Sequence, residues 1–377
     1  MKKLLSLLIM VTTISAGTGA QTIEWNGTAI GWTTANPSGS LQVQAGLRYL
    51  PELTFSMPAG ALSLEAKAAA NMWITGTAPG TDTLIMNSSL EPYRGWIKLS
   101  GNQFEVRAGL QKINFGSAQM LRPLMWFDRI DPRDPLQLTD GVYGLLGRYY
   151  FLNNANIWLW GLYGNDQTKG LERYPSPKKK PEWGGRVQLP LWTGEIAGTY
   201  HHRKISPDNV LPDSLHTGTI YNENRVALDG KFNLLIGLWF EGVLTHQNLD
   251  FTPYDYKTLL NGGADYTFGI GNGLTMTGEW FSYLTGEQPF AGDQAAHLAG
   301  ISATYPLNII HNLNAILFYD ITNRNFYRFV NWTMSYDRWT FHLMGFWNPE
   351  TYELYTFRQT NSLFGGWGLQ FMAVFNH

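Results

Sequence analysis

The sequence predicts an all-β protein, namely a transmembrane antiparallel up-and-down β-barrel of about 18 strands, within a range of 16–18. Three observations predict this fold class. Charged residues make up only 15% of the 377 residues while aromatic residues make up 14%, and ordinary soluble domains carry about 25% charged residues. Apolar and polar residues alternate in segment after segment along the chain. Short connections between these segments alternate with longer, polar ones.

The composition also excludes several classes of function. The chain has no cysteine, which rules out disulfide bridges, thiolate metal sites and a cysteine nucleophile. The formal net charge of −2 gives no reason to expect a nucleic acid as a partner. Disulfide-stabilised proteins, thiol enzymes and nucleic-acid-binding proteins are therefore not expected.

The first twenty residues have the pattern of a secretory signal peptide. Lys2 and Lys3 precede a mostly apolar run over 4–14, and Ala20 is a small residue suited to a cleavage site. An amphipathic first helix is the alternative interpretation. We expect residues 1–20 to direct export and to be removed.

The remaining chain, residues 21–377, is expected to form a single barrel domain. It contains no run of the roughly 18 apolar residues that a transmembrane helix requires. No internal repeat and no linker divides it. A membrane-spanning chain without such helices has to cross with strands.

A period of two is the main signal for these strands. In the segment 222–232, Val226 and Leu228 occupy even positions while Arg225 and Asp229 occupy odd ones. Alternate residues of a strand point to opposite faces, so one face is apolar and the other is polar. The same alternation appears in 41–49, 103–111 and 182–189.

Eighteen segments are predicted as strands. They are 22–32, 40–49, 61–72, 89–99, 102–112, 141–151, 154–165, 182–190, 193–203, 219–233, 235–247, 257–270, 273–285, 294–305, 311–321, 326–336, 339–347 and 362–375. Every second connection is usually short, and the others are usually longer, such as 166–180 and 204–218. This predicts short periplasmic turns and longer extracellular loops, with both chain ends on the periplasmic side. Two connections depart from the rule, because 51–60 is long for its side and 322–325 is short for the other.

Closure into a barrel follows from the membrane environment. An unpaired strand edge in lipid leaves backbone groups without partners, and a closed sheet has no edges. A soluble secreted protein with β-sandwiches or a propeller is the alternative. Strands of about eleven residues favour the barrel, because strands of globular sheets usually have five or six. The last strand supports it, since its apolar face runs to Phe375, as in the C-terminal strand of outer-membrane barrels that it resembles.

The inward face of the predicted barrel carries charges of both signs. Eighteen tilted strands give a backbone diameter of roughly 35 Å, which side chains alone cannot fill. The pore-lining candidates on the strands are Arg107, Arg148, Glu182, Arg186, Glu223, Arg225, Asp229 and Lys231. The same register places inward Arg48, Glu65, Lys67, Glu105, Glu195, Arg203, Glu241, Asp265 and Glu279. Pairing between neighbouring strands accounts for many of these charges, and the mixed signs argue against strong ion selectivity.

The longest connection, 113–140, is the strongest candidate for a constriction. It carries seven large apolar residues within 120–130 alone and needs apolar cover. These are Met120, Leu121, Leu124, Met125, Trp126, Phe127 and Ile130. Folding back into the lumen, docking onto another protein and capping the barrel surface would each provide that cover, and the first is favoured. The constriction candidates in this segment are Arg122, Asp128, Arg129, Asp131, Arg133 and Asp134.

A resemblance to known proteins adds to this interpretation. The run Arg-Ala-Gly-Leu-Gln-Lys-Ile-Asn-Phe-Gly at 107–116 precedes Asp-Arg-Ile-Asp-Pro-Arg-Asp-Pro at 128–135 and Arg-Tyr-Tyr-Phe at 148–151. This succession resembles bacterial porin-like families of large outer-membrane β-barrels, in which a strand leads to a loop with an Asp-Pro or Asn-Pro turn and then to the next strand. The resemblance implies channel function and supplies no catalytic residues.

Enzymatic function is not supported by the motifs. The eight histidines are scattered, and none lies in a nucleophile elbow or a zinc-binding motif. His201 and His202 are adjacent on one strand and therefore point to opposite faces. We predict no catalytic residues, no metal site and no cofactor.

Together these observations predict an exported outer-membrane channel of a Gram-negative cell for passive diffusion of small polar or charged solutes. The alternative is a barrel without transport activity that belongs to a larger outer-membrane assembly. A barrel hydrolase is a less favoured third hypothesis. The expected partners are outer-membrane lipid and small polar solutes, with a homo-oligomer or other outer-membrane proteins as further possibilities.

Overall fold

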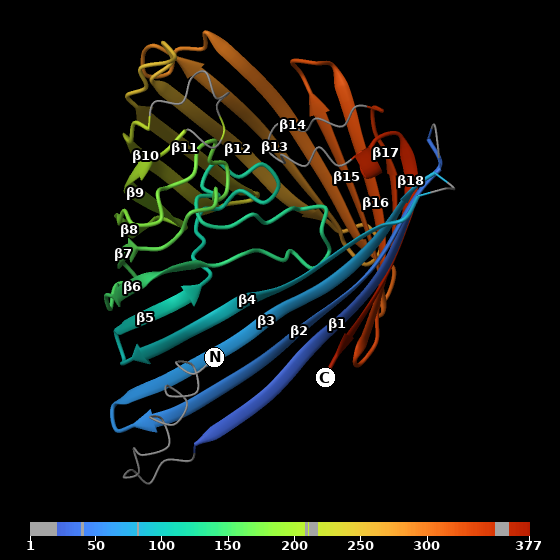
Figure 1. Ribbon diagram of the computed structural model, residues 1–377, viewed down its shortest axis with the longest axis horizontal. Helices are drawn as coiled ribbons and strands as arrows, with labels where there is room; N and C mark the ends of the chain where they lie inside the picture. Colours follow the sequence, from blue (N-terminus) through green and yellow to red (C-terminus); the bar gives the residue numbers. More distant parts are fainter. Residues whose placement is uncertain (1–20, 39–40, 81–82, 208–209, 211–217, 351–361) are drawn as a thin grey trace.

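Eighteen antiparallel strands close into one barrel (Figure 1). The computed structural model describes residues 21–38, 41–80, 83–207, 210, 218–350 and 362–377, so the predicted signal peptide lies outside the described residues. Each strand pairs with its neighbours in sequence, and β1 pairs with β18 to close the sheet. The predicted all-β barrel of 18 strands is thereby confirmed.

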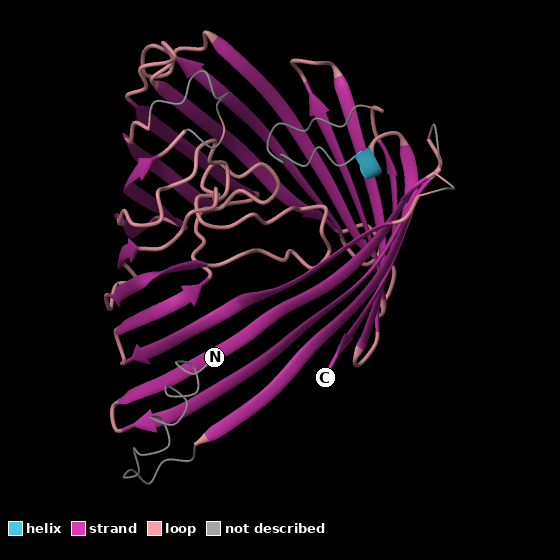
Figure 2. Cartoon of the chain, in the orientation of Figure 1, coloured by secondary structure: helices cyan, strands magenta, loops and turns pink. Residues whose placement is uncertain are grey.

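The strands differ widely in length. They are β1 (Thr22–Asn36), β2 (Gln42–Ala59), β3 (Leu62–Pro79), β4 (Ile85–Ser100), β5 (Phe104–Gln111), β6 (Val142–Tyr150), β7 (Asn156–Leu162), β8 (Glu182–Leu191), β9 (Gly194–Ile205), β10 (Tyr221–Asn233), β11 (Gly237–Gln247), β12 (Tyr256–Phe268), β13 (Leu274–Gly286), β14 (Gln294–Pro306), β15 (His311–Asp320), β16 (Asn325–Ser335), β17 (Trp339–Trp347) and β18 (Trp367–Asn376). Figure 2 shows that strands and loops make up nearly all of the described chain, apart from one 3₁₀ turn at Ser362–Phe364.

No helix in the described part of the chain is both long and apolar enough to cross a membrane.

Several predicted boundaries are wrong. For example, β3 extends to Pro79 and not to residue 72, and the largest errors concern β2, β3 and β18. The segment 51–60, predicted as a connection, belongs mostly to β2, and the turn is confined to Gly60 and Ala61. Pro51 is tolerated inside this strand because it pairs with Gly27 of β1 while the pairing of β2 with β3 is interrupted there. The last strand begins at Trp367 and not at residue 362, because the 3₁₀ turn precedes it.

The connections place short turns at one end of the barrel and longer loops at the other. We call these the short-turn end and the long-loop end. The long loops include 112–141, 163–181 and 348–366, and the connection at 321–324 is as short as predicted. The first and last strands meet at the short-turn end, where the backbone N–H of Gly27 donates to His377 O at 3.0 Å.

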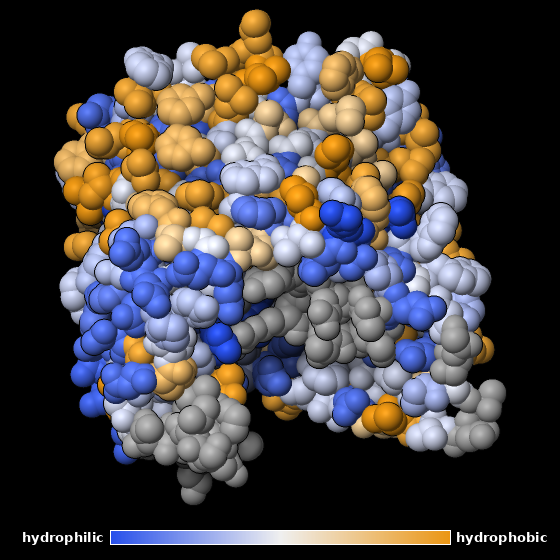
Figure 3. All heavy atoms as spheres, turned by 90° about the horizontal axis from the view of Figure 1, so that it is seen from above, coloured by the Kyte–Doolittle hydropathy of each residue, from blue (hydrophilic) through white to orange (hydrophobic). Residues whose placement is uncertain are grey.

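The alternation of residues follows the sheet. On β10 the exposed fractions of Val226 and Leu228 are 54% and 52%, while those of Arg225 and Asp229 are 3% and 2%. The apolar set therefore faces outward and the charged set faces the interior. Viewed from above, the surface carries hydrophobic side chains over a broad part of the wall, with hydrophilic residues gathered elsewhere (Figure 3).

The interior of the barrel holds an extended apolar core, which was not expected of an inward face. Residues of the segment 113–127 pack there against inward side chains of β6, β7 and β10–β17. Phe281, Leu298 and Phe318 are completely buried on this part of the wall. Period-two alternation did not reveal it, because strands apolar on both faces give no signal for which face is inside.

Candidate functional site: a folded-in loop and the cavity beside it

The segment 113–140, called the inner loop below, lies within the barrel (Figure 1). Ile113, Leu121 and Leu124 are at most 1% exposed, and Trp126 and Phe127 are 3% exposed. An apolar loop of this size avoids water by packing on the apolar inner wall. It is the element that narrows the barrel.

Glu241 on β11 holds the first part of the inner loop. Its Oε1 accepts the backbone N–H groups of Ser117 at 2.5 Å and Ala118 at 2.7 Å, and its Oε2 accepts that of Leu124 at 3.1 Å. Buried N–H groups of an irregular segment need acceptors, and a buried carboxylate needs donors. These hydrogen bonds therefore satisfy both the N–H groups of the loop and the buried carboxylate of Glu241.

Glu279 on β13 holds the next residues in the same way. Its carboxylate accepts the N–H groups of Gln119 at 2.6 Å, Met120 at 3.1 Å and Leu121 at 2.6 Å. Asn261 on β12 donates its side-chain amide to Leu121 O at 2.9 Å. Since the loop starts from β5 and β13 is eight strands further around the barrel, the loop crosses the interior.

Aromatic contacts fix the middle of the inner loop. The rings of Phe115 and Trp126 lie edge to face at 5.6 Å, and those of Phe127 and Trp160 do so at 5.6 Å. Phe127 also meets the His201 ring at 5.0 Å. Such contacts add packing energy and orientation beyond simple burial.

A second loop, 163–181, folds in beside the inner loop. The N–H of Leu171 donates to Met125 O at 3.3 Å, and Arg129 Nη2 donates to Thr168 Oγ1 at 2.7 Å. Gly170 has a φ of +46°, and a Cβ built there would clash with Met125 O. Glycine is therefore required where the two loops touch.

Charged residues tie the second loop to the wall. Glu172 accepts from Arg225 Nη2 at 3.0 Å and forms ion pairs with Arg203 Nη1 at 3.1 Å and Lys169 Nζ at 3.4 Å. Glu223 on β10 accepts from Arg203 Nη2 at 3.0 Å and Arg225 Nε at 2.7 Å. Each carboxylate in this group meets at least two cations, which offsets the cost of its burial.

A second buried group lies on β8, β9 and β10. Arg186 forms a bidentate pair with Asp229, with distances of 2.6 and 2.8 Å. Glu182 accepts from Lys169 Nζ at 2.9 Å and lies 3.2 Å from His201 Nε2. All of these side chains are at most 7% exposed.

Five of the charges named from the sequence are thus buried in these two groups, and they do not face open lumen. They are Glu182, Arg186, Glu223, Arg225 and Asp229. Lys169 and Glu172 join the buried charges Glu182, Arg203 and Arg225 but were missed, because nothing in the sequence marks which long loop folds inward. Glu241 and Glu279 were placed inward correctly, yet their contact with the inner loop had no sequence signal beyond an acidic residue on an apolar wall.

The remaining candidates on the strands lie elsewhere. Glu105 on β5 forms ion pairs with Arg148 at 3.2 Å and Arg107 at 3.5 Å, and Arg148 stacks over Trp158 at 3.7 Å. Lys231 lies opposite Glu195 in the strand register. Within the inner loop, Arg122 and Asp128 form a buried ion pair at 2.7 Å.

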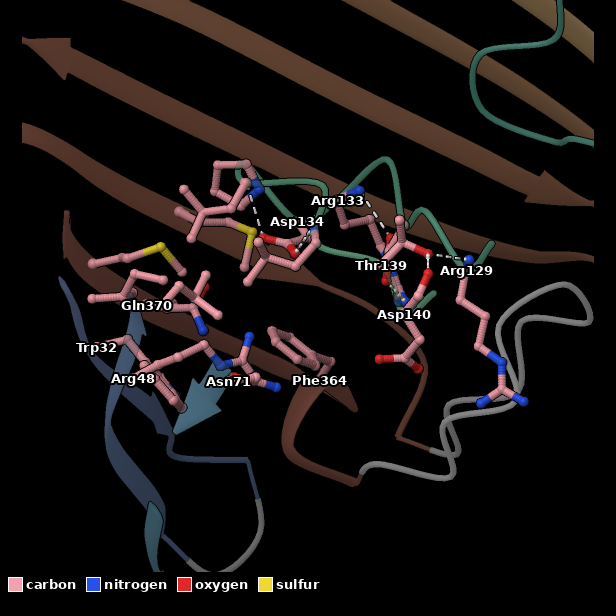
Figure 4. A pocket seen from close by; sticks show the side chains of 18 of the residues that line it. Trp32, Arg48, Asn71, Arg129, Arg133, Asp134, Thr139, Asp140, Phe364 and Gln370 are labelled. Carbon is pink, nitrogen blue, oxygen red and sulfur yellow. Dashed lines mark hydrogen bonds and ion pairs between the residues drawn. The ribbon is translucent and has the colours of Figure 1, made fainter. Parts of the chain in front are cut away.

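A cavity of about 490 Å³ remains open between residues 129–140 of the inner loop and the wall made by β1–β4 and β16–β18 (Figure 4). Its charged lining residues are Arg48, Arg129, Asp131, Arg133, Asp134 and Asp140. Figure 4 shows Arg48, Asn71 and Gln370 on the wall side, with Asp134 and Asp140 on the loop side. Aromatic and aliphatic side chains fill the lining between them.

The acidic groups of this cavity are held by local contacts. Asp131 Oδ1 accepts from Arg133 Nε at 2.7 Å, and Asp134 accepts the N–H groups of Leu136 at 3.0 Å and Leu138 at 3.1 Å. Burial raises the pKa of the Asp134 carboxyl above its usual range, although the two N–H donors act in the opposite direction. Asp134 therefore holds its proton to higher pH than an exposed aspartate.

Arg48 provides the opposing charge from the wall. Its guanidinium lies 5.8 Å from the centre of the Trp32 ring. Within the described part of the chain it forms neither an ion pair nor a hydrogen bond. Its charge is therefore available to whatever occupies the cavity.

No family model matches the sequence, and no curated protein matches it. Among solved structures, the chain is similar to OccAB1 of Acinetobacter baumannii, with a TM-score of 0.55 at 8% identity over 95% of this chain and 96% of that one. It is similar to OccAB4 of the same organism, with a TM-score of 0.54 at 10% identity over 95% and 98%. The trimer form of OmpT, an outer membrane protein of Vibrio cholerae, gives 0.53 at 10% identity over 95% and 100%.

The chain has the porin fold. The agreement extends over nearly the whole length of each structure, so it concerns the complete barrel. At 8–10% sequence identity, this agreement concerns the architecture of the barrel.

Proposed function

We propose that this porin-fold chain is an outer-membrane channel through which small polar or charged solutes diffuse passively. The observation that carries the proposal is the cavity of about 490 Å³ beside the inner loop. The two inward loops and the apolar core fill much of the remaining interior at this level. Solutes would therefore pass along the wall of β1–β3 and β16–β18.

The lining of the cavity supports passage of hydrated solutes. Arg48 on the wall and Asp134 and Asp140 on the loop offer charges of both signs, with Asn71 and Gln370 as neutral polar groups. Such groups replace part of the water shell of a solute as it passes the narrowest region. Because both signs are present, weak ion selectivity is expected.

The exterior supports the proposed location. Large apolar residues point outward all around the barrel, as on β8 at Trp183, β10 at Leu228 and β18 at Leu369, which are 52%, 52% and 55% exposed. A barrel of this kind is stable in a bilayer, where its outer face needs no water. Residues 1–20 would serve the export that this location requires.

The test is electrical recording in planar bilayers. Leu136 lines the cavity, so Leu136→Trp should partly fill it and lower the single-channel conductance. Leu343→Trp is the matched control, because Leu343 faces outward on β17 and is 38% exposed. A folded wild-type barrel without conductance steps would overturn the channel proposal, and unchanged conductance in Leu136→Trp alone would place the route elsewhere.

A further inference from the structure

Five successive turns at the short-turn end carry exposed, strongly apolar residues. They connect β6 with β7, β8 with β9, β10 with β11, β12 with β13, and β14 with β15. In that order they present Leu152, Trp192, Leu235, Ile270 and Ile309, with exposed fractions of 92%, 89%, 94%, 58% and 103%. We call these five connections the apolar turns.

The apolar turns contain no charged residue, and all of their residues are described. Their sequences are Phe-Leu-Asn-Asn-Ala, Trp-Thr, Leu-Leu-Ile, Gly-Ile-Gly-Asn-Gly and Leu-Asn-Ile-Ile. Three other short turns differ, with Gly-Ala at 60–61, Gly-Asn-Gln at 101–103 and Tyr-Asp-Arg at 336–338. The short-turn end therefore has an apolar arc from β6 to β15 and a more polar arc on the rest of the rim.

The apolar arc is continuous with the outward face of the wall. The Trp192 ring lies 6.2 Å from that of Phe232, a residue of β10. At the end of β6, the Phe151 ring lies 4.9 Å from the ring of Tyr149. At these two turns, aromatic rings lead directly from the turn to the apolar wall.

Strand length adds an argument for the turn between β6 and β7. β6, β7 and β8 have 9, 7 and 10 residues, while β2 and β3 each have 18. A tilted strand needs roughly 9–11 residues to cross the apolar part of a bilayer. β7 is too short to do so alone, and Phe151 and Leu152 in the adjoining turn would complete the crossing.

We propose that the apolar turns insert into the phospholipid layer at the short-turn end and anchor this arc of the barrel in the membrane. The turns at 60–61, 101–103 and 336–338 then lie in water on the opposite arc. This proposal rests on the membrane location given under the proposed function. It adds a lipid-binding surface on turns, which would otherwise expose large apolar side chains to water.

The absence of cysteine allows a direct measurement of depth. Single variants Leu235→Cys and Ile309→Cys of the full chain are labelled with bimane and reconstituted into phosphatidylcholine vesicles that contain brominated phospholipid. Ala61→Cys and Asn102→Cys on the polar arc are the aqueous controls. Leu228→Cys, outward on the wall of β10, is the lipid control.

Brominated lipid should quench Leu235→Cys and Ile309→Cys severalfold more than Ala61→Cys and Asn102→Cys, approaching Leu228→Cys. If both test positions are quenched no more than the polar-arc positions while Leu228→Cys is quenched, the anchor proposal fails and the membrane location stands. If Leu228→Cys escapes quenching in a folded barrel, the membrane location itself is wrong. Two test positions keep the result interpretable should one variant fail to fold.

Discussion

At the scale of single residues, two buried carboxylates decide where the inner loop lies. Glu241 and Glu279 together accept six backbone N–H groups of the loop. A carboxylate suits this role because both of its oxygens are acceptors only. Hydrogen bonds to a charged group contribute more than those between neutral groups.

Glu279→Gln should loosen the inner loop while leaving the barrel closed. The amide replaces one acceptor oxygen by an NH₂ group that faces N–H donors, so we expect the docked loop to lose about 1–3 kcal/mol. Trypsin should then cut after Arg129, which precedes Ile130, faster than in the wild type. Glu195→Gln is the matched control, because Glu195 faces inward and accepts from Gln188 away from the loop. Equal cleavage of the two variants would contradict the anchoring role of Glu279.

Asp134 should make ion selectivity depend on pH. Burial raises its pKa, so acidification protonates it before exposed aspartates are affected. Protonation removes one negative charge from the cavity while Arg48 stays charged, so anion permeability relative to cations should rise as pH falls through that pKa. Reversal potentials in a salt gradient measure this ratio. Asp134→Asn should show at neutral pH the selectivity that the wild type shows at acidic pH. If the selectivity of this variant keeps the pH dependence of the wild type, Asp134 is not the titrating group.

At the scale of elements, the strands were largely predictable and the loops were not. Period-two alternation, together with the spacing of the connections, predicted a segment within each of the eighteen strands. The error at β2 arose from Pro51, a residue that ordinarily ends a strand but is accommodated where pairing with β3 is interrupted. Local sequence could not predict Glu172 or Glu241 as loop partners, since each contact joins strands or loops far apart in the chain.

Contact between the two inward loops should depend on Gly170. Gly170→Ala places a Cβ against Met125 O in a left-handed backbone conformation, which should cost about 1–3 kcal/mol and separate the loops. Gly164→Ala is the matched control, since Gly164 also has a positive φ, of +86°, but has open space where the Cβ would lie. Faster proteolysis of the inner loop in Gly170→Ala than in Gly164→Ala is expected. The same rate in both would show that backbone strain, and not loop contact, dominates.

At the scale of the whole molecule, the barrel wall closes independently of the inner loop that lies inside it. All eighteen strands pair with their neighbours without using residues of the inner loop, so the sheet closes on its own hydrogen bonds. The loop instead covers apolar inward residues such as Leu298 and Phe318. The inner loop therefore narrows the interior, while the paired strands set the width of the barrel.

Deletion of residues 118–136 should therefore widen the channel without opening the sheet. The deletion removes most of the segment that borders the cavity and crosses the interior, so single-channel conductance should rise severalfold. It also exposes apolar wall to water inside the barrel, so the midpoint of thermal unfolding should fall. β-Sheet circular dichroism distinguishes a closed, wider barrel from an unfolded one. Unchanged conductance in a folded deletion variant would mean that solutes are limited at another level, and the inner loop would then serve as packing alone.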